Sequence, residues 1–121
     1  VLVDTTTGEP DDAVRIARDL TACGVRYLEA PISGSSEQTR LGEATILVGG
    51  DQETYQQLDS LWKILGKKVF HIGEVGGASR MKLVTNLVLG LHRLALAEGL
   101  SFAKRIGIEG RSALEVLKQS A

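Results

Sequence analysis

The sequence predicts an α/β fold that continues into a long helix, and three observations carry this prediction. Short runs rich in β-branched residues alternate with helix-like patterns over residues 1–72. The proline-free segment 78–106 then repeats apolar residues at steps of three and four, as an amphipathic helix does. Hydrophobic residues make up 43% and charged residues 24% of the 121 residues, which is typical of an ordinary globular protein.

The first strand and the first helix form one β-turn-α unit. Residues 1–3 are a short β-branched run that ends in Asp4 and a threonine turn, which suits the carboxyl end of a buried parallel strand. A helix is expected over residues 10–20, because Pro10 suits a first helical turn and Gly24 stops the apolar pattern.

Three further strands are expected, at residues 25–30, 44–48 and 68–72. Residues 32–42 are small and polar, and are expected to form a loop of about a dozen residues, a length that is often functional or disordered. A single helix is expected over residues 51–65, with a capping aspartate at its start and a glycine after its end.

Beyond the glycine-rich segment 73–77, one helix is expected over residues 78–106. At 1.5 Å per residue it would be on the order of 40 Å long, which favours burial between two domains or two subunits. Gly90 and Gly99 could bend or interrupt it, and a further helix is expected to begin near Ser112.

Charge and residue type exclude several classes of function. Fourteen lysines and arginines against 15 acidic residues give a net charge of -1, so no nucleic-acid partner and no acidic membrane surface is indicated. The longest unbroken apolar runs fall far short of the roughly 20 residues of a membrane span. Cys23, His71 and His92 match no zinc spacing, so no metal is expected. The single cysteine favours a reducing compartment, the cytoplasm or, in a eukaryote, the mitochondrial matrix.

The most suggestive polar group lies on the long helix. Lys82 and Asn86 are four residues apart and share one helix face, with Ser79 one turn earlier. A lysine near buried surface can donate a proton to a carbonyl oxygen that becomes an alkoxide, and an amide can fix that oxygen. On pattern alone, a solvated face of an amphipathic helix is the simpler interpretation.

Two polar turns each allow two interpretations, as a ligand-binding turn or as an ordinary turn. Ser33 and Gly34, with Ser35, could offer a hydroxyl and backbone N–H groups to a carboxylate, or could be an ordinary turn. The threonine turn that ends at Thr7 has the same two interpretations. The order Gly-x-Gly-x-x-Gly of a dinucleotide fingerprint is absent, and both histidines are expected to be structural.

Four motifs in register resemble the successive motifs of the β-hydroxyacid dehydrogenase family, of which 3-hydroxyisobutyrate dehydrogenase is the best-known type. They are Val3-Asp4-Thr5-Thr6-Thr7-x-x-Pro10, Leu28-Glu29-Ala30-Pro31-Ile32-Ser33-Gly34, Thr45-Ile46-Leu47-Val48-Gly49-Gly50 and Gly73-x-x-Gly76-x-x-x-x-x-Lys82-x-x-x-Asn86. Together they span nearly the whole chain and outweigh the solvated-face interpretation of Lys82.

The resemblance implies an oxidoreductase that passes hydride between NAD or NADP and a small 3-hydroxy acid or its semialdehyde. It implies Lys82 as the general acid/base and Asn86 as the neighbour that holds the reacting oxygen. Ser33 and Gly34 would bind the substrate carboxylate, and Thr7 would lie close to the nicotinamide. Among the candidate substrates are succinic semialdehyde, glyoxylate and tartronate semialdehyde, which the sequence does not distinguish.

The sequence departs from the family pattern in two places. Glu29 stands where the family usually has aspartate, and Ser35 stands where a second glycine is common, which would narrow the substrate loop. The 6-phosphogluconate dehydrogenases are similar too, but they place a histidine next to the asparagine where this chain has Thr85. The resemblance therefore favours the 3-hydroxyisobutyrate dehydrogenase type.

The resemblance also implies a division of the chain. Residues 1–77 would be the C-terminal part of a Rossmann-like NAD(P)-binding domain, and residues 78–121 the long interdomain helix and the start of an all-helical domain. The glycine fingerprint would lie upstream of Val1, so this piece alone is expected to bind dinucleotide weakly and to turn over little substrate. The full-length protein is expected to be a homo-oligomer.

A hypothesis from another class is a non-catalytic scaffold or oligomerisation module, because dehydrogenase-like domains that lost the lysine can persist as interaction platforms. The presence of both Lys82 and Asn86 argues against it. The apolar residues on several faces of the long helix fit either hypothesis.

Overall fold

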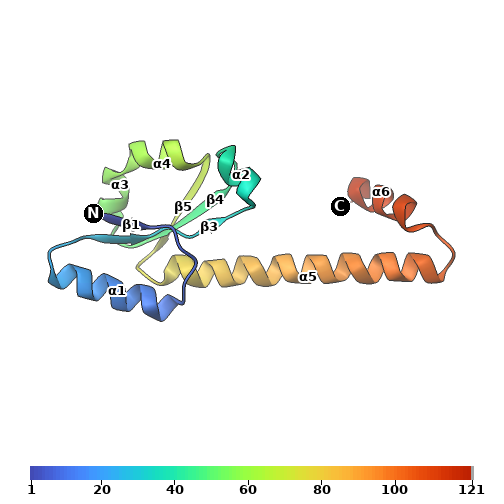
Figure 1. The fold of residues 1–121 in the computed structure, drawn as a ribbon, viewed down its shortest axis with the longest axis horizontal. Helices are drawn as coiled ribbons and strands as arrows, with labels where there is room; N and C mark the ends of the chain where they lie inside the picture. Colours follow the sequence, from blue (N-terminus) through green and yellow to red (C-terminus); the bar gives the residue numbers. More distant parts are fainter. Residues whose placement is uncertain (121) are drawn as a thin grey trace. The chain divides into compact units, whose positions relative to one another are not determined.

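A computed structural model describes residues 1–120, in two compact units, Val1–Thr85 and Asn86–Ala121 (Figure 1). The first unit is a five-stranded mixed sheet with helices on both faces. The α/β class predicted from the sequence is confirmed. The unit boundary falls inside the long helix, and the division predicted after residue 77 stays a prediction.

The sheet combines parallel and antiparallel pairs. Strand β1 (Leu2–Asp4) pairs in parallel with β2 (Tyr27–Glu29), and β4 (Thr45–Gly49) pairs in parallel with β5 (Lys68–Gly73). β4 runs antiparallel to both β2 and β3 (Ile32–Ser33). The pairings of β2 and of β3 with β4 follow one register. β2 and β3 are therefore one strand that is interrupted between Glu29 and Ile32.

Pro31 explains this interruption. A proline has no N–H to donate to a sheet, and here only its carbonyl is used, accepting from Leu47 N at 3.2 Å. β1 lies at one edge of the sheet, and Leu2 is 41% exposed. The first strand is therefore parallel as predicted, but the prediction that it is buried was wrong, because within residues 1–120 no strand pairs with its outer edge.

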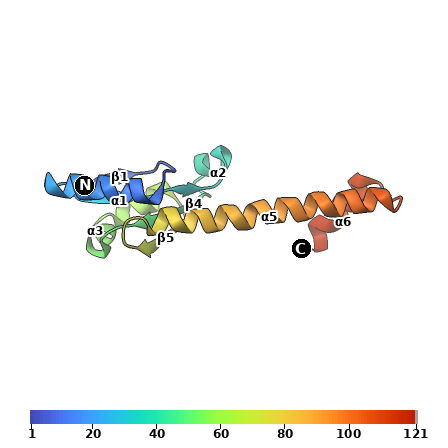
Figure 2. The ribbon, with the colours of Figure 1, turned by 90° about the horizontal axis from the view of Figure 1, so that it is seen from below.

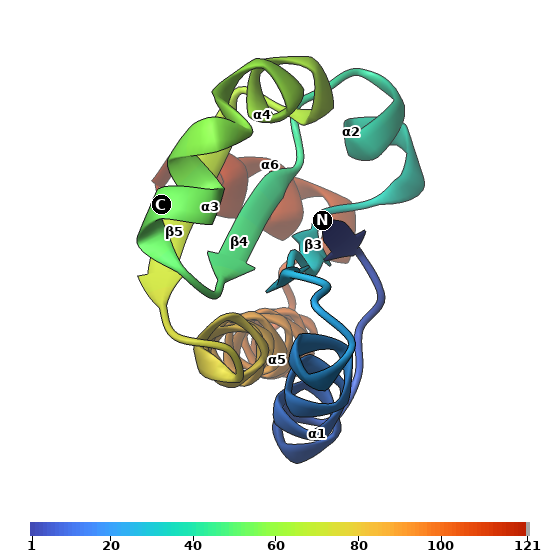
Figure 3. The same ribbon diagram turned by 90° about the vertical axis from the view of Figure 1, so that its left-hand side faces the viewer.

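Helices cover the two faces of the sheet. Helix α1 (Pro10–Ala22) and the first turns of α5 (Gly77–Arg105) lie on one face, and α3 (Gln52–Gln57) and α4 (Asp59–Leu65) lie on the other (Figure 3). The core between the layers is apolar. Its buried members are Leu28, Ala30, Ile46, Val48 and Trp62.

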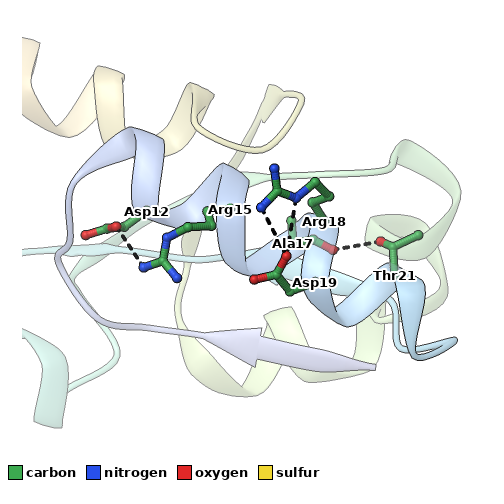
Figure 4. A network of polar contacts seen from close by, with 6 residues as sticks. All are labelled: Asp12, Arg15, Ala17, Arg18, Asp19 and Thr21. Atoms are coloured by element: carbon green, nitrogen blue, oxygen red, sulfur yellow. Dashed lines mark hydrogen bonds and ion pairs between the residues drawn. The ribbon is translucent and has the colours of Figure 1, made fainter.

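The outward face of α1 carries only exposed polar contacts. Arg15 pairs with Asp12 at 2.9 Å and Arg18 with Asp19 at 3.2 Å, and all four side chains are more than half exposed (Figure 4). Exposed ion pairs of this kind contribute little stability. Pro10 begins the helix, and Gly24 follows it with a φ of 72°, as its sequence pattern predicted.

The segment 32–42 is not the irregular loop that its polar composition predicted. It contains β3 and a short helix, α2 (Ser36–Arg40). The side chain of Ser35 accepts from Gln38 N at 3.2 Å, and the backbone N–H of Ser35 donates to Gln38 Oε1 at 2.8 Å. This reciprocal capping box satisfies two N–H groups at the start of α2 and so stabilises this helix of five residues.

The single helix predicted over residues 51–65 is two helices. The chain breaks at Leu58, whose φ of -101° and ψ of 20° are not helical, and α4 starts directly afterwards. Asp51 caps α3 as predicted, accepting from the backbone N–H and the hydroxyl of Thr54, both at 2.7 Å. The break lets Trp62 turn into the core, where its indole N–H donates to Tyr55 O at 2.8 Å.

The long helix α5 is continuous over 29 residues (Figures 1 and 2). Gly90 and Gly99 lie within it and do not interrupt it. Gly107, with a φ of 85°, follows its end, and the final helix α6 covers Gly110–Ser120. The helices predicted over 78–106 and from Ser112 are thus confirmed, the second starting two residues early.

By length and composition alone, α5 could also cross a membrane. One 18-residue stretch within it has a mean hydropathy of 1.2, and none of that stretch is buried in the structure. This differs from the expectation drawn from unbroken apolar runs, because charged residues such as Arg93 and Glu98 interrupt the runs without making the helix polar on average.

Candidate functional site

The candidate site begins where the parallel strands β1 and β2 end. Asp4 lies opposite Glu29 in the register of this pair, and Ala30 N donates to Asp4 O at 2.7 Å. The threonine turn therefore leaves the sheet beside Glu29, at the C-terminal end of β1, whereas the neighbouring strand continues in the sheet through β3 to Ser33. In α/β sheets the carboxyl ends of parallel strands are where ligands bind.

Glu29 is a buried carboxylate at the start of α5. Its side chain is 2% exposed and accepts from Ala78 N at 2.9 Å, from Ser79 N at 3.3 Å and from Ser79 Oγ at 2.5 Å. α5 has no acidic residue in its own first turn, so a strand supplies the negative charge that a helix N-terminus favours. The contact fastens the first turn of α5 to the sheet.

Gly49 makes room for this carboxylate. Gly49 lies opposite Glu29 in the antiparallel pair, and a Cβ at Gly49 would lie 2.9 Å from Glu29 Cγ and 3.0 Å from Glu29 Cδ. Any side chain here would push the glutamate away from α5. A glycine at this position is therefore required by packing, not by its backbone conformation.

Lys82 lies one turn further along α5 and also reaches the strand. Its ammonium group donates to the backbone carbonyl of Ile32, and the side chain is half-buried. Burial lowers the pKa of Lys82 below the ordinary value of 10.5. The ammonium thus lies beside the residue that precedes Ser33 and Gly34, instead of extending into solvent.

Ser33 and Gly34 lie at the end of β3. Ser33 pairs with Thr45 in the sheet and is half-buried, and Gly34 follows it. A Cβ at Gly34 would lie 2.8 Å from Ala44 Cβ, so the backbone of this turn is held against the residue before β4, with no space for a side chain. Backbone N–H groups in such a turn can approach a ligand closely.

Asp4 holds the threonine turn. Its carboxylate accepts from Thr6 N at 2.9 Å, from Thr6 Oγ1 at 2.7 Å and from the hydroxyl of Tyr27 at 3.0 Å. The Thr6 backbone N–H, followed by its hydroxyl, lowers the pKa of Asp4, whereas burial and then the hydrogen bond to Asp4 raise the pKa of Tyr27. Thr7 follows in the same turn and is exposed.

The remaining predicted residue, Asn86, is exposed and is the first residue of the second unit. Within the first unit, the structure brings Lys82 to the strand end that carries Ser33 and Gly34. Ser79, expected as part of a polar stripe with Lys82, is instead buried against Glu29. Sequence reasoning treated Glu29 only as a departure from a motif. The feature that marks Glu29 is its place as an acidic residue in β2, a strand in which every residue is buried.

The histidines play no part in this arrangement. His71 Nε2 lies 2.7 Å from Gly50 O, and its ring packs 4.9 Å from that of Tyr55, at the opposite end of β4 from Ser33. His92 is exposed. Among residues 1–120, no three His, Cys, Asp or Glu side chains are grouped to hold a metal ion.

The geometry fits proton transfer at a small polar ligand. A half-buried amine of lowered pKa lies next to a tight backbone turn, and the threonine turn with its exposed hydroxyls follows the C-terminal end of β1. Exposed hydroxyls of this kind can donate and accept hydrogen bonds with the polar groups of a ligand. Within residues 1–121 the order Gly-x-Gly-x-x-Gly of a dinucleotide fingerprint does not occur.

Two family models match the chain in succession. The NAD-binding domain of 6-phosphogluconate dehydrogenase matches residues 1–73, more than half of the chain. The NAD-binding domain of NADP-dependent 3-hydroxyisobutyrate dehydrogenase matches residues 76–121, which include Lys82 and α5. Both models describe NAD-binding domains, which confirms NAD or NADP as the cofactor class of the family.

Individual proteins show the same likeness. The chain is 37% identical to the cytokine-like nuclear factor N-PAC of Xenopus tropicalis over 97% of its length and 22% of that protein. It is 33% identical to the chloroplastic glyoxylate/succinic semialdehyde reductase 2 of Arabidopsis thaliana, covering 98% of this chain and 33% of the reductase.

A solved structure agrees with these relatives. The 3-hydroxyisobutyrate dehydrogenase of Mycobacterium tuberculosis, solved with L-serine, aligns with a TM-score of 0.86 at 26% identity, covering 97% of this chain and 40% of that one. The chain thus spans about a fifth to two fifths of the length of these proteins. On the family models and these likenesses together, the chain belongs to the β-hydroxyacid dehydrogenase family.

Proposed function

We propose that the full-length protein is an NAD(P)-dependent oxidoreductase of small 3-hydroxy acids or their semialdehydes, and that Lys82 is its general acid/base. One observation carries the proposal: the Lys82 ammonium is drawn to the Ile32 carbonyl, directly before the Ser33–Gly34 turn. A lysine on the solvated face of a helix would not make this contact.

The chemistry follows from the position and pKa of this amine. The bound nicotinamide would supply or accept hydride at the substrate carbon. In the reducing direction the Lys82 ammonium gives a proton to the carbonyl oxygen, and in the oxidising direction its neutral amine removes the hydroxyl proton. Burial lowers the pKa of Lys82, so the neutral amine forms at a lower pH than for a solvated lysine.

The remaining predicted residues complete the proposal. Ser33 and the backbone of Gly34 bind the substrate carboxylate, Asn86 holds the reacting oxygen, and Thr7 contacts the nicotinamide. The tight approach of Gly34 to Ala44 supports carboxylate binding by the Ser33–Gly34 turn, because it fixes the backbone N–H groups of the turn. We also propose the cytoplasm as its location and a homo-oligomer as its assembly.

A scaffold without catalytic activity is the second candidate. It is favoured by the likeness to N-PAC, which is named as a nuclear factor and is 37% identical to this chain. The half-buried position of Lys82 supports the enzyme instead, since a scaffold has no need of an amine at this turn.

The test is turnover by the full-length protein with Lys82→Ala. NAD(P)H oxidation is measured against glyoxylate, succinic semialdehyde and tartronate semialdehyde. We expect kcat to fall by about 10²–10⁴-fold, the usual contribution of a general acid. Lys63→Ala is the matched control, because Lys63 is 74% exposed and should leave kcat unchanged.

The outcomes separate the two candidates. Unchanged kcat in Lys82→Ala would remove the proposed acid. No turnover by the parent with any of the three substrates, or with the corresponding hydroxy acids and NAD(P), would favour the scaffold.

A further inference from the structure

We propose that Glu29 is a positioning residue, whose carboxylate fixes the first turn of α5 to the strand and so holds Lys82 at the Ile32 carbonyl. This inference rests on the proposed function, in which Lys82 carries the proton. Glu29 itself touches no reacting atom in this scheme. It acts through the helix that bears the lysine.

The contacts form two parallel links between one strand segment and one helix. Glu29 accepts from Ser79, and Ile32 accepts from Lys82. In each link the two partners are 50 residues apart in the sequence. The first link is buried and has three hydrogen bonds, whereas the second is a single bond from a half-buried side chain. The stronger link therefore sets the position of the weaker one.

The strength of the first link comes from charge and enclosure. Glu29 is 2% exposed, and its three donors are two N–H groups and one hydroxyl at the helix start. Hydrogen bonds to an ionised carboxylate are about twice as strong as neutral ones, and the helix dipole adds to them. Loss of the charge would leave the first turn of α5 held less firmly.

The glutamate and its facing glycine form a matched pair. Gly49 leaves the space that the extra methylene of glutamate occupies, and a Cβ there would meet Glu29 Cγ at 2.9 Å. An aspartate would keep the charge but would fall short of Ala78 and Ser79 by about one carbon–carbon bond. Glu29→Gln and Glu29→Asp are therefore expected to lower kcat by different amounts.

The experiment measures turnover in the full-length protein with Glu29→Gln and Glu29→Asp. Glu29→Gln keeps the size and removes the charge, and we expect kcat to fall on the order of 10²-fold, the effect of a misplacement of about 1 Å. KM for NAD(P) should stay within about twofold, because the threonine turn is held by Asp4 and not by Glu29. Glu29→Asp should recover part of kcat.

Asp51→Asn is the matched control. Asp51 caps α3 in the same way, accepting from the N–H and the hydroxyl of one residue, Thr54, but α3 bears no proposed site residue. A general loss of stability would affect both variants. A loss of positioning would lower kcat only in Glu29→Gln.

A second readout does not depend on turnover. Limited acylation with acetic anhydride, followed by mass spectrometry, reports how accessible and how nucleophilic the Lys82 amine is. We expect the fraction modified at Lys82 relative to Lys63 to change in Glu29→Gln and to stay at the parent value in Asp51→Asn.

These measurements distinguish the two proposals. If Lys82→Ala retains kcat, the proposed function fails, and the Lys82 acylation still decides whether Glu29 positions the amine. Parental kcat in Glu29→Gln, equal kcat losses in Glu29→Gln and Asp51→Asn, or unchanged Lys82 acylation would overturn the role of Glu29.

Discussion

The two units of this chain differ in what holds them together. In Val1–Thr85 a sheet buries Leu28, Val48 and Trp62 between helices on its two faces. In the described part of Asn86–Ala121, Ala103 alone is buried. The first unit is therefore stabilised by its apolar core, whereas the helices of the second depend on local signals. One such signal is Glu109, which accepts from the N–H groups of Arg111 and Ser112 at the start of α6.

Removing one leucine from each unit tests this difference most strongly. Leu28→Ala opens a cavity in a fully enclosed position and should lower the free energy of unfolding by about 2–5 kcal/mol. Leu91→Ala removes a side chain that is 55% exposed and should change it by less than about 0.5 kcal/mol. Urea unfolding of the 121-residue chain, followed by tryptophan fluorescence and circular dichroism, measures both. Equal losses in the two variants would contradict the comparison.

Two glycines provide a second matched pair. Gly49→Ala places a methyl group against the buried side chain of Glu29 and should cost about 1–3 kcal/mol of stability. Gly90→Ala meets no atom within 4 Å inside α5, so alanine should instead add about 0.5–1 kcal/mol through better helix propensity. Thermal unfolding by circular dichroism gives both signs. A destabilising Gly90→Ala would show that the surface of α5 at this residue is packed.

Acid gives the smallest expected effect. The Thr6 N–H, followed by its hydroxyl, lowers the pKa of Asp4, so this contribution to stability is present above the ordinary pKa of 3.8. It is lost as the pH falls through the lowered pKa. Asp4→Asn should therefore flatten the acid limb of the unfolding curve of the first unit. An identical acid limb in the variant would show that the threonine turn does not depend on this carboxylate.

In the second unit, acid should act on Glu109 at the start of α6. The N–H of Arg111, followed by that of Ser112, lowers the pKa of Glu109. Because few side chains are buried around α6, protonation of Glu109 should unwind this helix locally without a cooperative transition. Circular dichroism between about pH 5 and pH 2, the range of carboxylate titration, should show a gradual loss of helix in the parent chain. This pH-dependent loss should be absent in Glu109→Gln.

Local patterns predicted most of the fold. Pro10 and Gly24 bounded the first helix correctly, and the apolar steps of the long helix placed its ends within one residue of Gly77–Arg105. In each case the deciding interactions lie within a few residues of one another, so the sequence displays them directly.

Two local features were not predicted, and only the first of them has a clear signal in the sequence. Ser35 and Gln38 have the spacing of a capping box, which outweighed the polar composition that suggested a loop. The break at Leu58 has a weaker signal, because leucine favours helix and the break depends on Trp62 reaching the core. Propensity alone predicts a continuous helix there.

The candidate site was only partly predictable for a different reason. The motifs singled out Lys82, Ser33 and Gly34 through resemblance, but nothing local shows that Lys82 contacts Ile32. The role of Glu29 was hidden because its partners are about 50 residues away, and their meeting depends on how the sheet and α5 pack. The sequence marks the residue types, and the tertiary structure determines their contacts.

The equal spacing of the two strand–helix links has a consequence for insertions and deletions. Ser79 and Lys82 are three positions apart, so their side chains lie on the same side of α5, about 60° apart around its axis. One residue added between them would turn Lys82 by about 100° around that axis. The amine would then be directed away from the Ile32 carbonyl while every side chain of the site remained in the sequence. Chain length between these two residues is thus as demanding a requirement as their identity.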